Sequence, residues 1–299
     1  MVRLFKDYCL RYLSGGIVNK FIFANVALYI LLLFIGVFST LFNVGTFADH
    51  ILSFLELPAS LPQLLFRPWT LFTYMFVHAG VWHLLWNMIA LFLFGKIFLE
   101  FFSARQFAGV YILGGLAGAL FYVIAYNLFP YFSPVLAYSR MVGASAAVFA
   151  IVVATAVRSP EYRINLLLIG SVRLSTLALV TVAISFIMLT GDNAGGNFAH
   201  LGGAFAGWLF AYMLGKGTDI ISLVVRPFES FASFLKRPGS KRKAKFTYVK
   251  GGRNADYEYN ARKKADEAEV DRILEKIKKG GYASLSEEEK KRLFEASSK

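Results

Sequence analysis

Three short segments of the chain carry side chains that could act together on a carbonyl group. His78, His83 and Asn87 lie in HAGVWHLLWN, Ser145 lies in GASAAVF, and His200 lies in NFAHLGG. A serine hydroxyl is a weak nucleophile until a neighbouring base, most often an imidazole, removes its proton. These residues are therefore candidates for nucleophilic catalysis by a serine and a histidine.

Further groups could support such a pair. His83 and Asn87 are four residues apart and share one helix face, where they could stabilise an oxyanion together with the Ser145 backbone N–H. Phe149 lies four residues after Ser145, where its ring could hold an imidazole. The apolar segments contain no Asp or Glu at that depth, and one cysteine excludes a Cys-based metal cluster. We therefore expect a Ser–His dyad without a metal or a cofactor.

Each candidate also has an interpretation without catalysis. A serine in a membrane helix commonly bonds to its own backbone. His200 could be a packed core histidine or part of a proton relay, and His78 is better explained as a structural residue. The catalytic interpretation is favoured because the candidates occur together near the outer ends of their segments.

The elements that must position these residues are apolar helices. Of the 299 residues, 57% are hydrophobic and 17% are charged, which disfavours a soluble enzyme and excludes a disordered chain. A membrane helix needs roughly 20 mostly apolar residues. The sequence predicts an all-α membrane protein with six spans, at about 21–43, 71–95, 106–129, 143–157, 172–190 and 198–215.

Small residues recur on three of these segments at spacings that place them on one helix face. Such faces allow helix backbones to approach closely, as a short serine–imidazole hydrogen bond between two helices requires. The residues are Gly114 and Gly118 on the third segment, Ala146, Ala147, Ala150 and Ala154 on the fourth, and Gly202, Gly203, Ala206 and Gly207 on the sixth.

The net charge of +13 is unevenly distributed, with +5 in residues 1–215 and +8 in residues 216–299. Cytoplasmic loops are enriched in Lys and Arg. Nine basic residues before residue 216 fall on one side of the six segments, and only Arg67 and Arg140 fall on the other. We therefore expect both termini in the cytoplasm. Because the basic tail contains no recognised nucleic-acid-binding module, we expect no nucleic-acid partner.

These motifs, in this order, resemble the rhomboid family of intramembrane serine proteases over roughly residues 20–215. The resemblance implies a six-helix bundle in which Ser145 is the nucleophile and His200 the general base and acid. It also implies oxyanion roles for His83 and Asn87, stacking of Phe149 on His200, and space at Gly143 beside the oxyanion hole.

The sequence departs from the family pattern at three places. Ala146 follows the serine where glycine is usual, and Phe149 stands where tyrosine is frequent. The family's Trp-Arg pair in the first loop is replaced by RPWT, which contains Trp69 with Arg67 before it. The last difference concerns the packing of the long loop at 44–70, which we expect to lie along the outer interface as an amphipathic element.

The resemblance implies hydrolysis of peptide bonds in or beside the transmembrane helices of other membrane proteins, in a bacterial inner membrane. One alternative is a catalytically inactive rhomboid-like protein that binds or escorts membrane clients, although such proteins characteristically lack the serine or histidine present here. A transporter or channel is another, and it would tolerate replacement of Ser145.

The sequence also predicts how the chain is divided. A cytoplasmic segment (1–20) precedes a six-helix protease domain (21–217), a basic linker (218–255) and a helical hairpin domain (256–299). The basic cluster at 236–245 could bind anionic lipid headgroups or could be a solvated linker. In the hairpin, Gly280 and Gly281 should end one helix, and Ser286 with Glu289 should cap the next.

Overall fold

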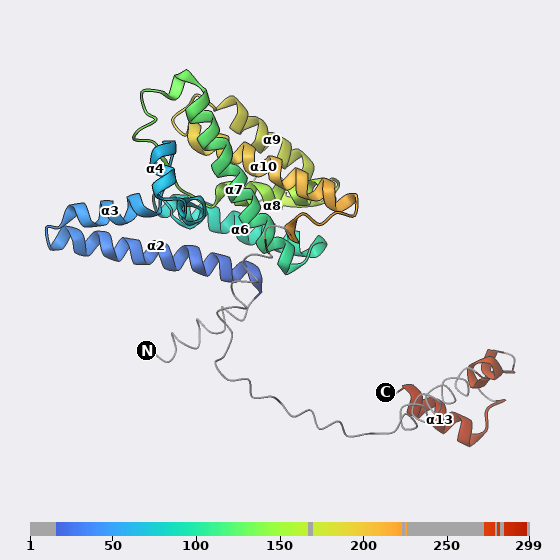
Figure 1. Cartoon of the computed structure of the whole chain (residues 1–299). Coiled ribbons are helices and arrows are strands. Elements are labelled where there is room, and N and C mark those ends of the chain that lie inside the picture. The colour runs from blue at the N-terminus through green and yellow to red at the C-terminus, as the bar shows by residue number, and fades with distance from the viewer. Residues whose placement is uncertain are drawn as a thin grey trace, which may run out of the picture. The chain divides into compact units, whose positions relative to one another are not determined.

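The computed structural model describes residues 16–166, 170–222, 225, 272–278, 280–281 and 284–297. The chain separates into two compact units, Met1–Arg237 and Pro238–Lys299. The described part is predominantly helical, as the sequence predicted (Figure 1).

The described part of the first unit contains six apolar helices, which fall into a longer and a shorter group. Four of them are long and apolar enough to cross a membrane, namely α2 (Ile17–Leu41), α6 (Val81–Phe101), α7 (Ala104–Leu128) and α10 (Ala194–Gly215). The other two, α8 (Ser145–Arg158) and α9 (Leu174–Ile187), are apolar but have only 14 residues each. All six helices correspond to segments predicted from the sequence, although only four reach the length of a full span.

The outer faces of these helices are strongly apolar. Phe34 on α2, Trp82 and Trp86 on α6, and Ile187 on α9 are between 58% and 77% exposed. Apolar surface of this extent on a monomer marks contact with a membrane or a partner. Together with the length of four of the helices, it identifies an integral membrane protein.

Close packing of α10 against α7 and α8 rests on the predicted small residues. A Cβ at Gly203 would lie 2.0 Å from the carbonyl oxygen of Ala146, and one at Gly207 would lie 2.2 Å from that of Ala150. A Cβ at Gly118 on α7 would lie 2.5 Å from the Ala146 Cβ. The prediction that these faces allow close backbone approach is confirmed.

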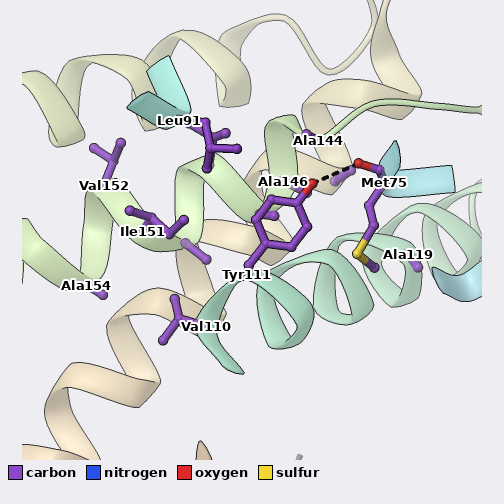
Figure 2. Close-up of a cluster of buried hydrophobic side chains, with 14 of the residues drawn as sticks. Met75, Leu91, Val110, Tyr111, Ala119, Ala144, Ala146, Ile151, Val152 and Ala154 are labelled. Carbon is purple, nitrogen blue, oxygen red and sulfur yellow. Dashed lines mark hydrogen bonds between the residues drawn. The ribbon is translucent and has the colours of Figure 1, made fainter. Parts of the chain in front are cut away.

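The core of the first unit contains buried side chains from α6, α7, α8 and α10, and Figure 2 shows a cluster of them. Tyr111 of α7 is completely buried, and its hydroxyl donates a hydrogen bond of 3.0 Å to the carbonyl of Met75. Leu91 of α6 and Ile151 of α8 are also fully buried. The buried phenol is therefore paired, and it fixes the short segment before α6 against α7.

The second predicted span, at 71–95, is wrong at its start. Residues in this range first form α5 (Thr70–Thr73) and the 3₁₀ helix η1 (Tyr74–Phe76). Gly80 is then fully extended, with φ −173° and ψ 171°, so α6 begins only at Val81 and continues to Phe101. Hydropathy could not locate this break, because Leu71–Val77 is as apolar as the helix that follows.

The long loop between α2 and α5 contains helix α3 (Gly45–Leu55), strand β1 (Leu57–Pro58) and helix α4 (Leu61–Phe66). Three side chains bind the carbonyls at the C-terminal end of α3. Arg67 donates to Ser53, Trp69 to Phe54 and Thr73 to Leu55. These bonds satisfy carbonyls that a helix end leaves without partners. Arg67 and Trp69 of the RPWT segment therefore both hold the end of α3.

Two short antiparallel strand pairs were not predicted. Strand β1 pairs with β2 (Arg140–Met141), with Leu57 opposite Met141 and Pro58 opposite Arg140. Strands β3 (Arg163–Leu166) and β4 (Gly170–Arg173) pair between α8 and α9. The 3₁₀ helix η2 (Pro130–Phe132) follows α7. The β1–β2 pair matters for the site because β2 ends two residues before Gly143.

The described part of the second unit consists of two helical segments. Residues 272–278 are helical, with Ile273 buried and Leu274 about half exposed. Gly281 has φ +74°, and its N–H bonds to the Ile277 carbonyl, which ends this helix. The basic cluster at 236–245 lies outside the described residues.

Helix α13 (Glu287–Ser297) begins with the predicted capping box. The Ser286 N–H donates to the Glu289 carboxylate at 2.8 Å, and the Glu289 N–H donates to the Ser286 hydroxyl at 3.3 Å. Lys276 of the preceding helix also bonds to Glu289 at 2.8 Å. The lysine and the capping N–H together lower the pKa of the Glu289 carboxyl to about 2.

Candidate active site

Ser145 and His200 come from different helices and meet at hydrogen-bond distance. Ser145 is the first residue of α8, and His200 lies in the second turn of α10. Their side chains approach to 2.9 Å between Ser145 Oγ and His200 Nε2. The glycines of α10 permit this distance, because a larger side chain at Gly203 would push the two helix backbones apart.

The imidazole of His200 has two further contacts. The ring of Phe149 stacks on it, with the centroids 4.3 Å apart and the planes at 6°. On the edge away from Ser145, Nδ1 lies 3.2 Å from the hydroxyl oxygen of Ser185 on α9. The ring is therefore held in its plane by one residue and contacted at both nitrogens by hydroxyl groups.

His83 lies beside the turn that leads into α8. A Cβ at Gly143 would lie 2.8 Å from both Cε1 and Nε2 of His83, and Gly143 has φ +124°. The Nδ1 atom of His83 accepts a hydrogen bond from the Ala79 N–H at 3.4 Å. A neutral imidazole that accepts at one nitrogen carries its proton on the other. His83 therefore presents an Nε2–H donor next to Gly143 and Ser145.

Asn87 lies one helical turn after His83 on α6 and is buried. Its amide nitrogen donates to the carbonyl of His83 at 2.8 Å, which uses one of its two N–H groups. The second N–H and the amide oxygen remain to meet a ligand or water in the neighbouring cavity.

A cavity of about 660 Å³ joins these groups. Four of the predicted site residues line it: Ser145, His200, His83 and Asn87. The remaining lining residues come from the segment before α6, from α7, from the β2 segment, from the loop before α10 and from the first turn of α10. They are Ala79, Tyr122, Tyr126, Ser139, Arg140, Met141, Val142, Asp192, Asn193, Gly195 and Gly196.

A model of the Rhomboid domain matches residues 66–217, which is half of the chain. Of the six apolar helices, this range contains all except α2. The chain belongs to the rhomboid family. A second family, DUF6576, of unknown function, matches residues 253–299, so this rhomboid protein carries a small extra C-terminal segment. No curated protein matches the chain.

Among the predicted site residues, His78 lies outside the helix in which the sequence placed it. It precedes α6 instead of lying within that helix, and its ring contacts His83 edge to face with centroids 5.1 Å apart. The side chain is buried, and neither ring nitrogen has a hydrogen-bond partner within the part of the chain that the structure describes. His78 lines a separate cavity of about 620 Å³ between α2 and α3, not the cavity that contains Ser145.

The sequence also predicted the start of α10 about four residues too far along the chain. The helix begins at Ala194, not near residue 198, because the glycine-rich and asparagine-containing segment before His200 is already helical. Asn197 donates to the carbonyl of Met188, which links the start of α10 to the end of α9. His200 is consequently well inside the helix, where its backbone cannot fray.

Sequence reasoning missed two residues of the rhomboid site. Ser185 is a serine in an apolar helix, and a polar residue at such a position is a functional candidate. Tyr122 is 1% exposed and lines the cavity, yet its hydroxyl has no partner among the described residues. Neither residue belongs to a local motif, so only their isolation in apolar segments could have indicated them.

No group of three or more His, Cys, Asp or Glu residues that could hold a metal ion occurs in the described ranges. The cavity that contains Ser145 is lined by hydroxyls, imidazoles, amides, phenols, one guanidinium and one carboxylate.

Proposed function

We propose that this rhomboid-family protein is an intramembrane serine endopeptidase that cleaves peptide bonds in or next to the transmembrane helices of other membrane proteins. The observation that carries the proposal is the 2.9 Å contact between Ser145 Oγ and His200 Nε2. A serine paired with an imidazole at this distance is the arrangement by which a hydroxyl becomes a nucleophile.

In the first half of the reaction, His200 Nε2 takes the proton of Ser145 as Oγ attacks the substrate carbonyl. The negative charge that forms on the carbonyl oxygen is stabilised by the His83 Nε2–H, by Asn87 and by the N–H of Ser145 at the start of α8. His200 then gives its proton to the leaving nitrogen, the peptide bond breaks, and an acyl-serine remains.

In the second half, a water molecule replaces the leaving amine. His200 removes a proton from this water as its oxygen attacks the acyl carbonyl, and the same donors stabilise the second oxyanion. The proton returns to Ser145 Oγ when the ester bond breaks. The cavity of about 660 Å³ supports the proposal because it gives both the substrate carbonyl and water access to Ser145.

The same proposal requires six membrane spans. Four helices are long enough, and we infer that α8 and α9 also cross. An α8 of 14 residues extends about 21 Å, less than the roughly 30 Å hydrocarbon thickness. Because its first residue is the nucleophile, α8 needs only to reach the floor of the cavity and not the outer surface.

The distribution of basic residues supports an orientation with both termini in the cytoplasm and the cavity toward the outer side. We propose a bacterial inner membrane as the location, as the resemblance to rhomboid proteases implies. We place the protease domain at 21–217, between the segment 1–20 and the basic linker 218–255, and the hairpin domain at 256–299.

The test is cleavage of a model transmembrane substrate in liposomes by the full-length protein. Ser145→Ala and His200→Ala should each lower kcat by about 10³-fold or more, because nucleophile and base act as a unit. Ser53→Ala and His50→Ala are matched controls, since both residues lie on α3 outside the cavity, and they should cleave as wild type does.

A serine-reactive fluorophosphonate gives a second measurement. Wild type should be labelled and Ser145→Ala should not. Cleavage that persists in both dyad variants would contradict the assignment. A wild-type protein that binds the substrate without cleaving it or taking the label would instead be an inactive rhomboid-like protein that escorts membrane clients.

A further inference from the structure

We propose that Ser185 is a positioning residue for His200, one that holds the imidazole in the tautomer and rotation that leave Nε2 free to accept the Ser145 proton. The inference rests on the proposed function. It adds a third residue to the expected dyad, which becomes a serine–histidine–serine arrangement without a charged member. Its three members come from α8, α10 and α9 respectively.

The geometry places the two serines on opposite edges of one ring. Ser145 Oγ lies 2.9 Å from Nε2, and Ser185 Oγ lies 3.2 Å from Nδ1. Ser185 is 3% exposed, so no bulk water competes for Nδ1 from that side. When Nδ1–H donates to Ser185, the neutral ring must have an unprotonated Nε2, which is the form that can act as a base.

Stacking alone cannot select this form. The Phe149 ring is nearly parallel to the imidazole, so it fixes the plane of the ring. A rotation of His200 by 180° about its Cβ–Cγ bond keeps the ring in the same plane and preserves the stacking, but it carries Nε2 away from Ser145. A hydrogen bond at Nδ1 opposes that rotation, because the rotated ring would present a carbon atom to Ser185.

A hydroxyl in a helix can instead donate to a carbonyl of its own helix, and Thr181, one turn earlier on α9, does so. Thr181 donates to the carbonyls of Leu177 and Ala178 at 3.0 Å, which satisfies its hydroxyl within α9. Ser185 Oγ instead lies against the ring nitrogen of His200. Its hydroxyl can accept from Nδ1–H and still keep its own proton for a helix carbonyl.

A hydroxyl also suits the surroundings better than a carboxylate would. An ionised carboxylate in an apolar helix carries a large desolvation cost. A serine accepts the same hydrogen bond, both from the neutral ring and from the imidazolium that forms during the reaction, without bringing a charge into the site.

The experiment compares Ser185→Ala, Ser185→Thr and Thr181→Val in the full-length protein, with cleavage measured in liposomes at several substrate concentrations. We expect Ser185→Ala to lower kcat about tenfold, the effect of one lost hydrogen bond to a charged ring, and to leave KM unchanged. Ser185→Thr should restore most of kcat because it keeps the hydroxyl. Thr181→Val should behave as wild type.

A spectroscopic measurement distinguishes positioning from a general loss of packing. The chain has four histidines, so the ring ¹⁵N signals of labelled protein can be assigned by difference from His200→Ala. We expect His200 in wild type to carry its proton on Nδ1, and Ser185→Ala to contain a larger fraction protonated on Nε2. Ser185→Cys, of similar volume but with a weak hydrogen-bonding group, should resemble Ser185→Ala.

The outcomes separate this inference from the proposed function. If wild type neither cleaves nor takes the fluorophosphonate label, the proposed function fails, and the ¹⁵N spectra still decide whether Ser185 sets the tautomer. If Ser145→Ala abolishes cleavage while Ser185→Ala retains both the wild-type kcat and the wild-type tautomer, Ser185 is not a positioning residue.

Discussion

Gly143 shows how one residue can determine the shape of the site. Its φ of +124° is a backbone conformation that other residues rarely adopt, and a Cβ there would lie 2.8 Å from the ring of His83. Its N–H bonds to the carbonyl of Tyr74 at 3.0 Å, which fixes the turn before Ser145. The glycine is therefore required both by its conformation and by the close approach of His83.

We predict that Gly143→Ala lowers kcat by about tenfold or more, because the added Cβ displaces His83 from the oxyanion or forces the turn into another conformation. The measurement is kcat together with the melting temperature of the purified protein. Gly45→Ala is the control, since Gly45 has open space around it and no positive φ. Unchanged kcat in a folded Gly143→Ala protein would contradict a role for this turn in catalysis.

The residues that the sequence predicted best are those within one local motif. Ser145 and Phe149, or His83 and Asn87, are four residues apart, so helical geometry alone places them on one face. Ser185 and Tyr122 could not be found in this way. Their relation to the site depends on how α9 and α7 are rotated about their axes, which is decided by packing between helices distant in sequence.

Among the elements, α10 has the least tolerance for change, because its small residues touch backbone atoms of two neighbours. Gly203 faces the carbonyl of Ala146, and Gly202 faces that of Ala117. Helix α10 therefore lies between α7 and α8, and at these two glycine positions there is no room for a side chain. The position of His200 relative to Ser145 follows from these contacts.

We predict that Gly203→Ala destabilises the protein by about 2 kcal/mol and lowers its activity, because α8 must move away from α10 and separate Ser145 from His200. The melting temperature in detergent and kcat should fall together. Gly36→Ala on α2, where a Cβ would meet no atom within 4 Å, should leave both unchanged. Equal stability of the two variants would show that the close helix contact is not required.

Element boundaries were harder to predict than the existence of the elements. The small-residue faces were correctly identified because their spacing is regular along a helix. The start of α6 at Val81, the β1–β2 pair and the binding of Arg67, Trp69 and Thr73 to the end of α3 were not predicted. Each depends on backbone hydrogen bonds or side chains that come from elsewhere in the chain, which apolar periodicity does not encode.

For the molecule as a whole, charge and hydropathy separate two units. The apolar helices belong to the first unit, and most of the charged residues belong to the region after residue 215. The described helices of the second unit are joined by Lys276 and Glu289. Ile273 of the first helix and Leu285, which precedes α13, are both buried. The second unit thus has internal contacts of its own.

We predict that deletion of residues 238–299 leaves kcat on a model substrate within about twofold of wild type and leaves the melting temperature of the membrane unit unchanged, because each unit is compact by its own internal contacts. The measurement compares the shortened and full-length proteins in the same liposomes. A loss of cleavage that is restored by adding the full-length inactive Ser145→Ala protein would show instead that the C-terminal region takes part in the reaction.

The attachment of α3 has a mechanical consequence for the protein. Side chains of three later residues hold its C-terminal end, a single residue separates that end from β1, and a single residue separates β2 from Gly143. Because β1 and β2 are hydrogen-bonded, a displacement of α3 is transmitted through the strand pair to the turn before Ser145. A force applied to α3 would therefore reach the turn before Ser145 through this linkage, without any molecule touching Ser145 or His200.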